Sequence, residues 1–213
     1  MTDTPMTTDR RWMAALVRLH TCHEAVEWAE AQPSFEHLWA TCERGDWLMW
    51  LVPRVMDGEP ESPERKRIVA VAVACARLAL PIYEARYPQD RRVLDCLDTT
   101  ERWTRGEATL EKLREARNAA SSAAVAAYAA DSASSASYAA SSASVYAASA
   151  ASAASYAASD ASSASYAASD ASYAAYAAYA AKAQTLRACA DIVRQHFTAG
   201  EVQAALNASG GTP

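Results

Sequence analysis

Apolar and polar residues recur along most of the chain with the three-to-four-residue spacing of amphipathic helices. This spacing runs from Arg10 to Ala31, after which Pro33 ends the helix and Ser34 caps a second helix that reaches Cys42. Sustained alternation of the kind a strand needs occurs only near residues 69–73, and a strong helix start precedes that run. The pattern therefore predicts an all-α protein.

Glycine, proline and capping residues divide the first half into short helices. Arg44-Gly45-Asp46-Trp47 places a glycine able to take the left-handed conformation at a helix end, followed by an aspartate suited to cap the next helix. We expect Pro53 to limit that helix to about two turns. Ser62-Pro63-Glu64 has the order typical of a helix start, which predicts a helix from Pro63 to Leu80 that Pro81 ends. Asp90 is expected to cap a further helix that runs through Trp103 to Arg105.

Residues 116–181 form a low-complexity tract in which 33 of 66 residues are Ala, 18 are Ser and 8 are Tyr. The tract has no Gly or Pro, and alanine is the strongest helix former, so we predict helix here. Alanine recurs through it at alternating spacings of three and four, as the core positions of a heptad do. This predicts a seam on which a second helix packs closely. The seam alanines are Ala126, Ala129, Ala133, Ala136, Ala140, Ala143, Ala147, Ala150, Ala154, Ala157, Ala161, Ala164, Ala168, Ala171, Ala175 and Ala178.

The unbroken seam favours one helix of ~80 Å, although Ser-Ser and Ser-Asp steps in the tract allow helical hairpins instead. Tyrosines point away from the seam and are candidates for protein binding, or else they cover the Trp-rich domain or a neighbouring helix. They are Tyr128, Tyr138, Tyr156, Tyr166 and Tyr173.

We divide the chain into four parts. Residues 1–9 are expected to be flexible, residues 10–115 to form a compact helical domain that holds all six tryptophans, and residues 116–181 to form the Ala/Ser/Tyr-rich tract. Residues 182–213 are expected to form an amphipathic helix that returns to the core and ends at Gly200, a possible short helix, and a frayed tail.

The charge and the cysteines exclude several classes of protein. A net charge of −5 without clustered Lys and Arg argues against nucleic-acid binding. The longest apolar run, from Ile68 to Ala76, is too short to cross a bilayer, so we expect no membrane contact. Five widely spaced cysteines and the lack of a signal sequence predict reduced thiols and a cytoplasmic protein.

No pattern of reactive side chains predicts catalysis. Five histidines and cysteines near the start of the chain could in principle bind a metal: His20, Cys22, His23, His37 and Cys42. Their spacing fits no standard zinc pattern, so we expect no metal and no cofactor. A thiol at Cys22 or Cys42 is the only candidate for a catalytic group in the sequence. No pattern identifies a histidine that would act as its base, so we do not favour an enzyme. Glu24, Glu27 and Glu30 share one helical face, which we interpret as a solvated surface or, less favoured, as a docking surface for a basic partner.

Three segments together resemble a known family. They are Cys22-His-Glu-Ala-Val-Glu-Trp28, then Trp39-Ala-Thr-Cys42-Glu-Arg44-Gly45-Asp46-Trp47-Leu-Met-Trp50, and an apolar helix containing Cys75-Ala-Arg77. Over residues 16–115 the chain resembles the fifth immunity protein family of bacterial polymorphic-toxin systems, whose relatives also occur in phage genomes. The resemblance implies an all-helical fold that binds and neutralises a toxin. It also makes Arg44, Asp46, Trp47 and Trp50 candidates for protein binding.

The favoured function is therefore a non-enzymatic protein-binding module that pairs with a toxin, with itself, or with both. One alternative is a structural or ice-binding-like alanine-rich helix, but no threonine occurs between Thr109 and Thr185 to form a regular threonine face. Another alternative is a self-associating accessory protein of a phage or bacterium.

Overall fold

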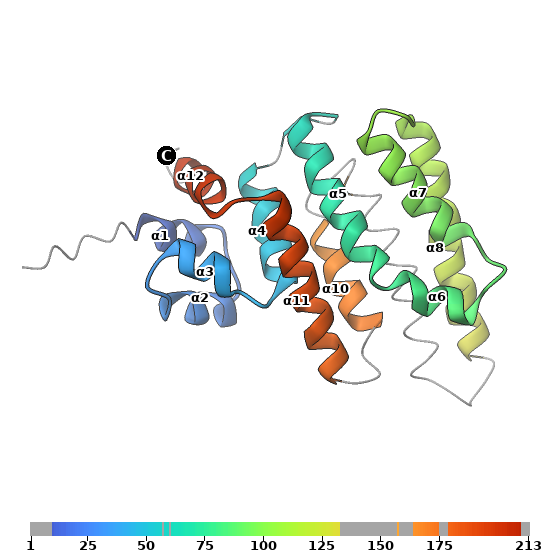
Figure 1. Ribbon diagram of the computed structural model, residues 1–213, viewed down its shortest axis with the longest axis horizontal. Helices are drawn as coiled ribbons and strands as arrows, with labels where there is room; N and C mark the ends of the chain where they lie inside the picture. Colours follow the sequence, from blue (N-terminus) through green and yellow to red (C-terminus); the bar gives the residue numbers. More distant parts are fainter. Residues whose placement is uncertain are drawn as a thin grey trace, which may run out of the picture.

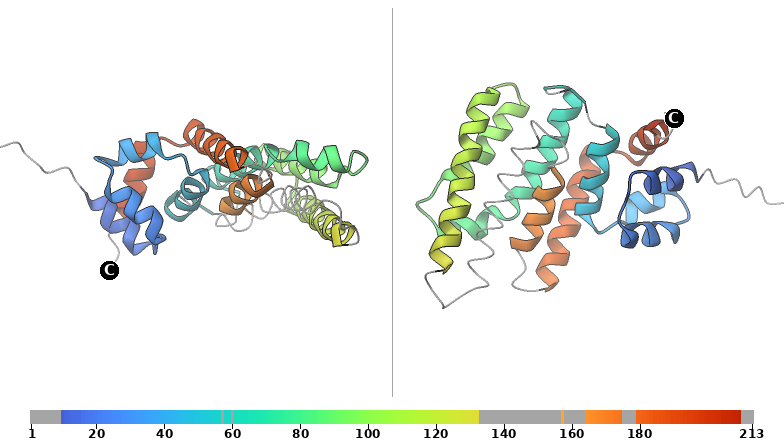
Figure 2. Two further views of the ribbon diagram at one scale, coloured as in Figure 1. Left: turned by 90° about the horizontal axis from the view of Figure 1, so that it is seen from below. Right: turned by 180° about the vertical axis from the view of Figure 1, so that it is seen from behind.

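The structure is a computed structural model that describes residues 10–56, 58–59, 61–132, 157, 164–174 and 179–209. These residues contain eleven helices and no strand, so the all-α prediction is confirmed. The helices form an elongated, flattened array (Figures 1 and 2), with the first and last helices grouped at one end.

The end group contains α1 (Arg11–Arg18), α2 (His23–Glu30), α3 (Phe35–Thr41) and α12 (Ala199–Ser209), and α12 packs against α1, α3 and α4. The single helix expected from Arg10 to Ala31 is wrong. His20 has a φ of 57°, and the Thr21 hydroxyl donates to the carbonyl of Leu16 at 2.7 Å, which ends α1. Ser34 caps α3 as predicted, because its Oγ accepts from the backbone N–H of His37 at 3.1 Å.

The centre contains α4 (Gly45–Met56), α5 (Pro63–Arg77), α10 (Ala164–Ala174) and α11 (Tyr179–His196), all in mutual contact except that α4 meets α5 only lightly. Ser62 caps α5 as predicted by accepting from the N–H of Arg65 at 3.1 Å. The expectation that Pro53 limits α4 to about two turns is wrong. α4 continues to Met56 because Leu51, Val52 and Pro53 are buried, and this packing offsets the lost backbone hydrogen bond.

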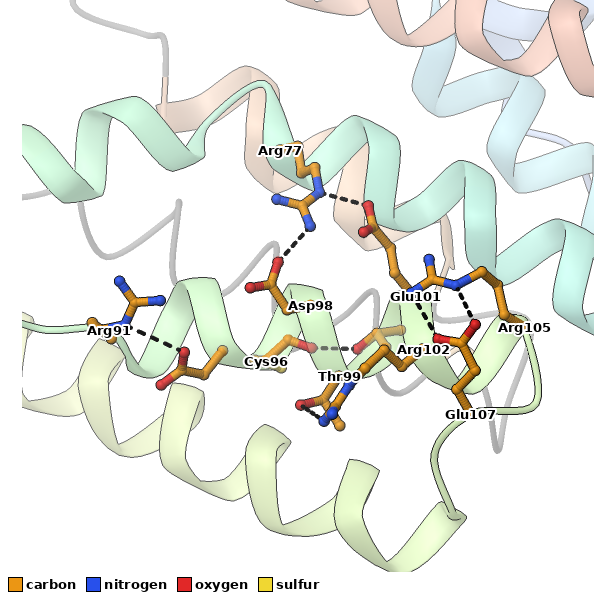
Figure 3. A network of polar contacts seen from close by, with 11 residues as sticks. Arg77, Arg91, Cys96, Asp98, Thr99, Glu101, Arg102, Arg105 and Glu107 are labelled. Atoms are coloured by element: carbon orange, nitrogen blue, oxygen red, sulfur yellow. Dashed lines mark hydrogen bonds and ion pairs between the residues drawn. The ribbon is translucent and has the colours of Figure 1, made fainter.

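The far end contains α6 (Leu80–Arg86), α7 (Arg92–Thr104) and α8 (Leu110–Ser132). Pro81 does not end α5, which stops at Arg77, but lies in the first turn of α6, where its missing N–H is not needed. Figure 3 shows Arg77 between Asp98 and Glu101 of α7, with both ion pairs at 2.7 Å. No single helix of the described residues has the length and apolar composition to cross a membrane, and only the bent pair α5 and α6 passes that test together.

The alanine-rich tract does not form one long helix, so the favoured alternative is wrong. α8, α10 and the start of α11 are separate helices, and α10 packs beside α11 as well as on α4 and α5 (Figure 1). α10 and α11 thus resemble the hairpin that was the second alternative. The last helices are α11 and α12 as expected, but Gly200 lies inside α12. The break at residues 197–198 comes from Thr198, which exchanges hydrogen bonds with Glu201 as a capping box.

Gly45 begins α4 at a point where α11 comes into direct contact with it. A Cβ placed on Gly45 would lie 2.4 Å from Cβ of Cys189, 2.6 Å from the carbonyl oxygen of Leu186 and 2.7 Å from the nitrogen of Ala190. Gly45 does not have the positive φ that the sequence led us to expect. Glycine is required here because no side chain fits between the two helices.

Two arginines, Arg194 and Arg67, attach α11 to neighbouring helices. The Arg194 guanidinium donates to the carbonyl of Trp39 at 2.7 Å and also to that of Cys42, so a cation closes the carboxyl end of α3. Arg67 of α5 donates to the carbonyl of His196 at 2.7 Å, and its guanidinium lies 4.2 Å from the ring centroid of Phe197. Helices from both halves of the chain therefore hold one another in place.

We predict that Gly45→Ala lowers the free energy of unfolding by about 1–3 kcal/mol, because the added methyl must displace backbone atoms of α11. Gly200→Ala is the matched control, since a Cβ there meets nothing within 4 Å, and we expect it to be neutral or to stabilise by up to about 1 kcal/mol. Urea denaturation of the two variants measures both effects. Equal stability of Gly45→Ala and the unchanged protein would contradict the close contact of α4 and α11.

Candidate functional site

Two adjoining hollows, which we call the cleft, are lined by α2, α4 and α10. The apolar compartment has a volume of about 260 Å³, and the polar compartment has a volume of about 460 Å³. They adjoin because both are lined by Trp28, Cys42, Asp46, Trp47 and Ser169. The cleft thus presents an apolar surface directly beside a charged one.

The apolar compartment is walled mainly by aromatic and aliphatic side chains. The cleft is lined by three half-buried tryptophans, Trp28, Trp47 and Trp50. The other three, Trp12, Trp39 and Trp103, are buried in the core. Its lining residues are Leu16, Thr21, Cys22, Ala25, Trp28, Ala29, Leu38, Cys42, Asp46, Trp47, Leu48, Trp50, Leu51, Tyr166 and Ser169. Its surface has few polar groups, so it favours an apolar occupant.

The Arg44-Gly45-Asp46-Trp47 block forms the corner between the two compartments. Arg44 Nε and Nη2 donate to the two carboxylate oxygens of Asp46 at 2.9 and 2.8 Å, and the guanidinium lies 4.3 Å from the ring centroid of Trp47. Glu24 of α2 accepts a further hydrogen bond from Arg44 at 3.3 Å. Asp46 does not stand before the helix as its cap but lies in the first turn of α4, where its negative charge is favourable.

Tyr166 and Tyr173 line the cleft from α10. Tyr166 is 62% exposed beside the apolar compartment, and Tyr173 is 39% exposed beside the polar compartment. The ammonium of Lys182 lies 4.2 Å from the ring centroid of Tyr173. Two groups of candidates that are more than 100 residues apart in the sequence therefore meet at one site.

The structure does not place the other three candidate tyrosines at this site. Tyr138 and Tyr156 lie outside the described residues, and of Tyr128 only the backbone in α8 is described. The sequence analysis did not single out Trp28, Glu24 or Lys182 as one site. Their separation along the chain gives no local signal, although the acidic face of α2 was visible in the sequence.

The alanine seam is only partly described, and its register is wrong at its first position. Ala126 is exposed, whereas Ala123 and Ala127 are buried, because the face of α8 that packs on α7 follows Leu113 and not the seam. Ala157 and Ala171 are fully buried, and Ala164 and Ala168 lie in α10. The other seam positions fall outside the described residues or their side chains do: Ala129, Ala133, Ala136, Ala140, Ala143, Ala147, Ala150, Ala154, Ala161, Ala175 and Ala178.

The two thiols that line the cleft differ in their exposure to solvent. Burial raises the pKa of the Cys42 thiol to about 11, so this thiol is protonated and a poor nucleophile at neutral pH. Cys22 is exposed at the apolar compartment, and the other four cysteines are buried. No three His, Cys, Asp or Glu side chains of the described chain gather where they could hold a metal ion.

In a comparison with protein families, the family described as Immunity protein Imm5 matches residues 42–197. No curated protein and no solved structure matches the chain. The matched span begins later than the resemblance at residues 16–115 and includes the alanine-rich tract. It contains Arg44, Trp47, Tyr166 and Tyr173, so most of the cleft is built from it, while α2 adds one wall.

Asp170 of α10 provides a pH-dependent prediction, because burial raises the pKa of its carboxyl from 3.8 to about 6. The folded protein therefore loses stability as the pH rises from about 4 to 6, and the full penalty remains above this range. We expect Asp170→Asn to stabilise the protein at pH 7.5 by roughly 1–3 kcal/mol and to have little effect at pH 4.

Urea denaturation at the two pH values measures this difference. Asp95→Asn is the control, because Asp95 is an exposed carboxylate whose contact with Arg91 is 3.6 Å long. The same gain at both pH values in Asp170→Asn would show that the carboxyl is not ionised at a cost in the folded protein.

Proposed function

The chain belongs to the Imm5 family of immunity proteins, and we propose that it neutralises a toxin protein by binding it at the cleft. Immunity proteins generally act without a reaction of their own, which agrees with a binding role. The proposed partner is a protein and not a nucleic acid or a membrane, and the proposed location is the cytoplasm, where the five thiols stay reduced.

The composition of the cleft carries this proposal. Tryptophan, tyrosine and arginine are the residues that most often dominate the binding energy of protein interfaces, and they meet here around an apolar hollow. The described residues expose only five large apolar side chains, and two of them are Tyr166 and Tyr173. Exposed aromatic rings beside a hollow are available to a partner at little cost in side-chain entropy.

The rigidity of the corner supports the same function. Arg44 is held by Asp46, Glu24 and the face of Trp47, so its side chain is already ordered before a partner arrives. An ordered interface loses less conformational entropy on binding than a mobile one.

We predict that Tyr166→Ala combined with Tyr173→Ala weakens toxin binding at least tenfold, which corresponds to about 1.4 kcal/mol, and restores toxicity in cells. The toxin for this test is the product of the gene adjacent to this one, co-expressed with it. Growth and copurification are the two measurements.

Val125→Ala is the matched control, because Val125 is 69% exposed on α8 and does not line the cleft. Unchanged binding by the double tyrosine variant would exclude the cleft as the binding site. Protection of cells without any complex would contradict neutralisation by binding.

A further inference from the structure

The apolar compartment has the size of a site for one side chain. Its volume of about 260 Å³ exceeds the ~150 Å³ cavity that holds benzene but falls below the ~300–1,000 Å³ typical of sites for drug-sized molecules. Trp47, Trp50 and Tyr166 provide aromatic walls for it. One aromatic or branched aliphatic side chain fits these dimensions and this lining.

The α2 side of the cleft carries excess negative charge. The single guanidinium of Arg44 is shared by the carboxylates of Asp46 and Glu24, and the Glu24 side chain is 74% exposed. Glu27 and Glu30 lie further along α2 and line neither compartment, so Glu24 is the carboxylate that α2 presents to the cleft. Across the polar compartment, Glu43 is already paired with Arg187 at 2.9 Å and Lys182 covers Tyr173. A cation that reaches Glu24 thus meets a carboxylate whose charge Arg44 only partly balances.

We propose that the occupant of the cleft is a toxin segment that inserts one aromatic or branched aliphatic side chain into the apolar compartment. A neighbouring Lys or Arg of the same segment lies against Glu24 of α2. This inference rests on the proposed function and names the chemistry of the partner at that site. The apolar side chain provides the anchor, and the charge selects the segment and its direction.

Three small aromatic compounds that differ in charge test the chemistry of the site in the full-length protein. Tryptamine carries an ammonium, indole is neutral and indole-3-acetate carries a carboxylate. We expect tryptamine to bind about three- to tenfold more tightly than indole-3-acetate at low salt, with indole between them, and the difference to shrink as salt is added. Two-dimensional NMR titration measures the three affinities.

Glu24→Gln should reduce the preference for tryptamine, whereas Glu36→Gln, on α3 and away from the cleft lining, should keep it. Tighter binding of the anion, or no saturable binding of any of the three compounds, overturns the inference.

Cys22 allows the compartment to be blocked without a mutation, since it is the exposed cysteine at its edge. Modification with N-benzylmaleimide should abolish tryptamine binding and weaken the complex with the adjacent gene's product at least tenfold. Methylthiolation of the same thiol adds a much smaller group and should have a smaller effect. Full toxin affinity after benzyl modification overturns the inference, whereas toxin binding at the cleft is decided separately by the double tyrosine variant. Failure of the unmodified protein to bind the toxin contradicts the proposed function, while the ranking of the indoles still decides the chemistry of the cleft.

Discussion

The close approach of α4 and α11 at Gly45 is the contact on which the rest of the site depends. A hydrogen in place of a side chain lets the first turn of α4 lie directly against Cys189 and Ala190. This contact places Arg44, Asp46 and Trp47 opposite Lys182 and next to α10. The Arg194 side chain of α11 also donates a hydrogen bond to the backbone carbonyl of Trp39 in α3. This bond holds α3 and α11, which both contribute to the cleft, in a fixed relation.

The alanine-rich tract contains α10, whose small side chains let it pack closely against α4, α5 and α11. α10 buries Ala167 and Ala171 against α4 and α5 and turns Tyr166 and Tyr173 toward the surface. Small side chains permit close packing but contribute little apolar area, at ~0.8 kcal/mol for each buried CH₂ group. The half-buried carboxyl of Asp170 adds a cost at neutral pH.

Local features of the fold could be predicted from the sequence, whereas long-range contacts could not. Ser34 and Ser62 were identified as caps because a capping side chain acts within three residues of its own position. Gly45 was recognised as special for the wrong reason, since its partner lies more than 140 residues away in α11. A separation of more than 100 residues likewise hid the meeting of the Arg44 block with Tyr166 and Tyr173. Each group was a candidate by its own chemistry, but their common site follows only from packing. The regular alanine spacing suggested one helix because periodicity does not show where a chain turns back.

Hydrogen–deuterium exchange of the protein alone and in complex with the product of the adjacent gene shows whether the toxin covers the cleft. We expect amides of residues 22–28, the first turn of α4 and residues 166–173 to exchange more slowly in the complex, while α7 and α8 are unaffected. Slower exchange confined to α7 and α8, with no change around the cleft, would contradict toxin binding at the cleft.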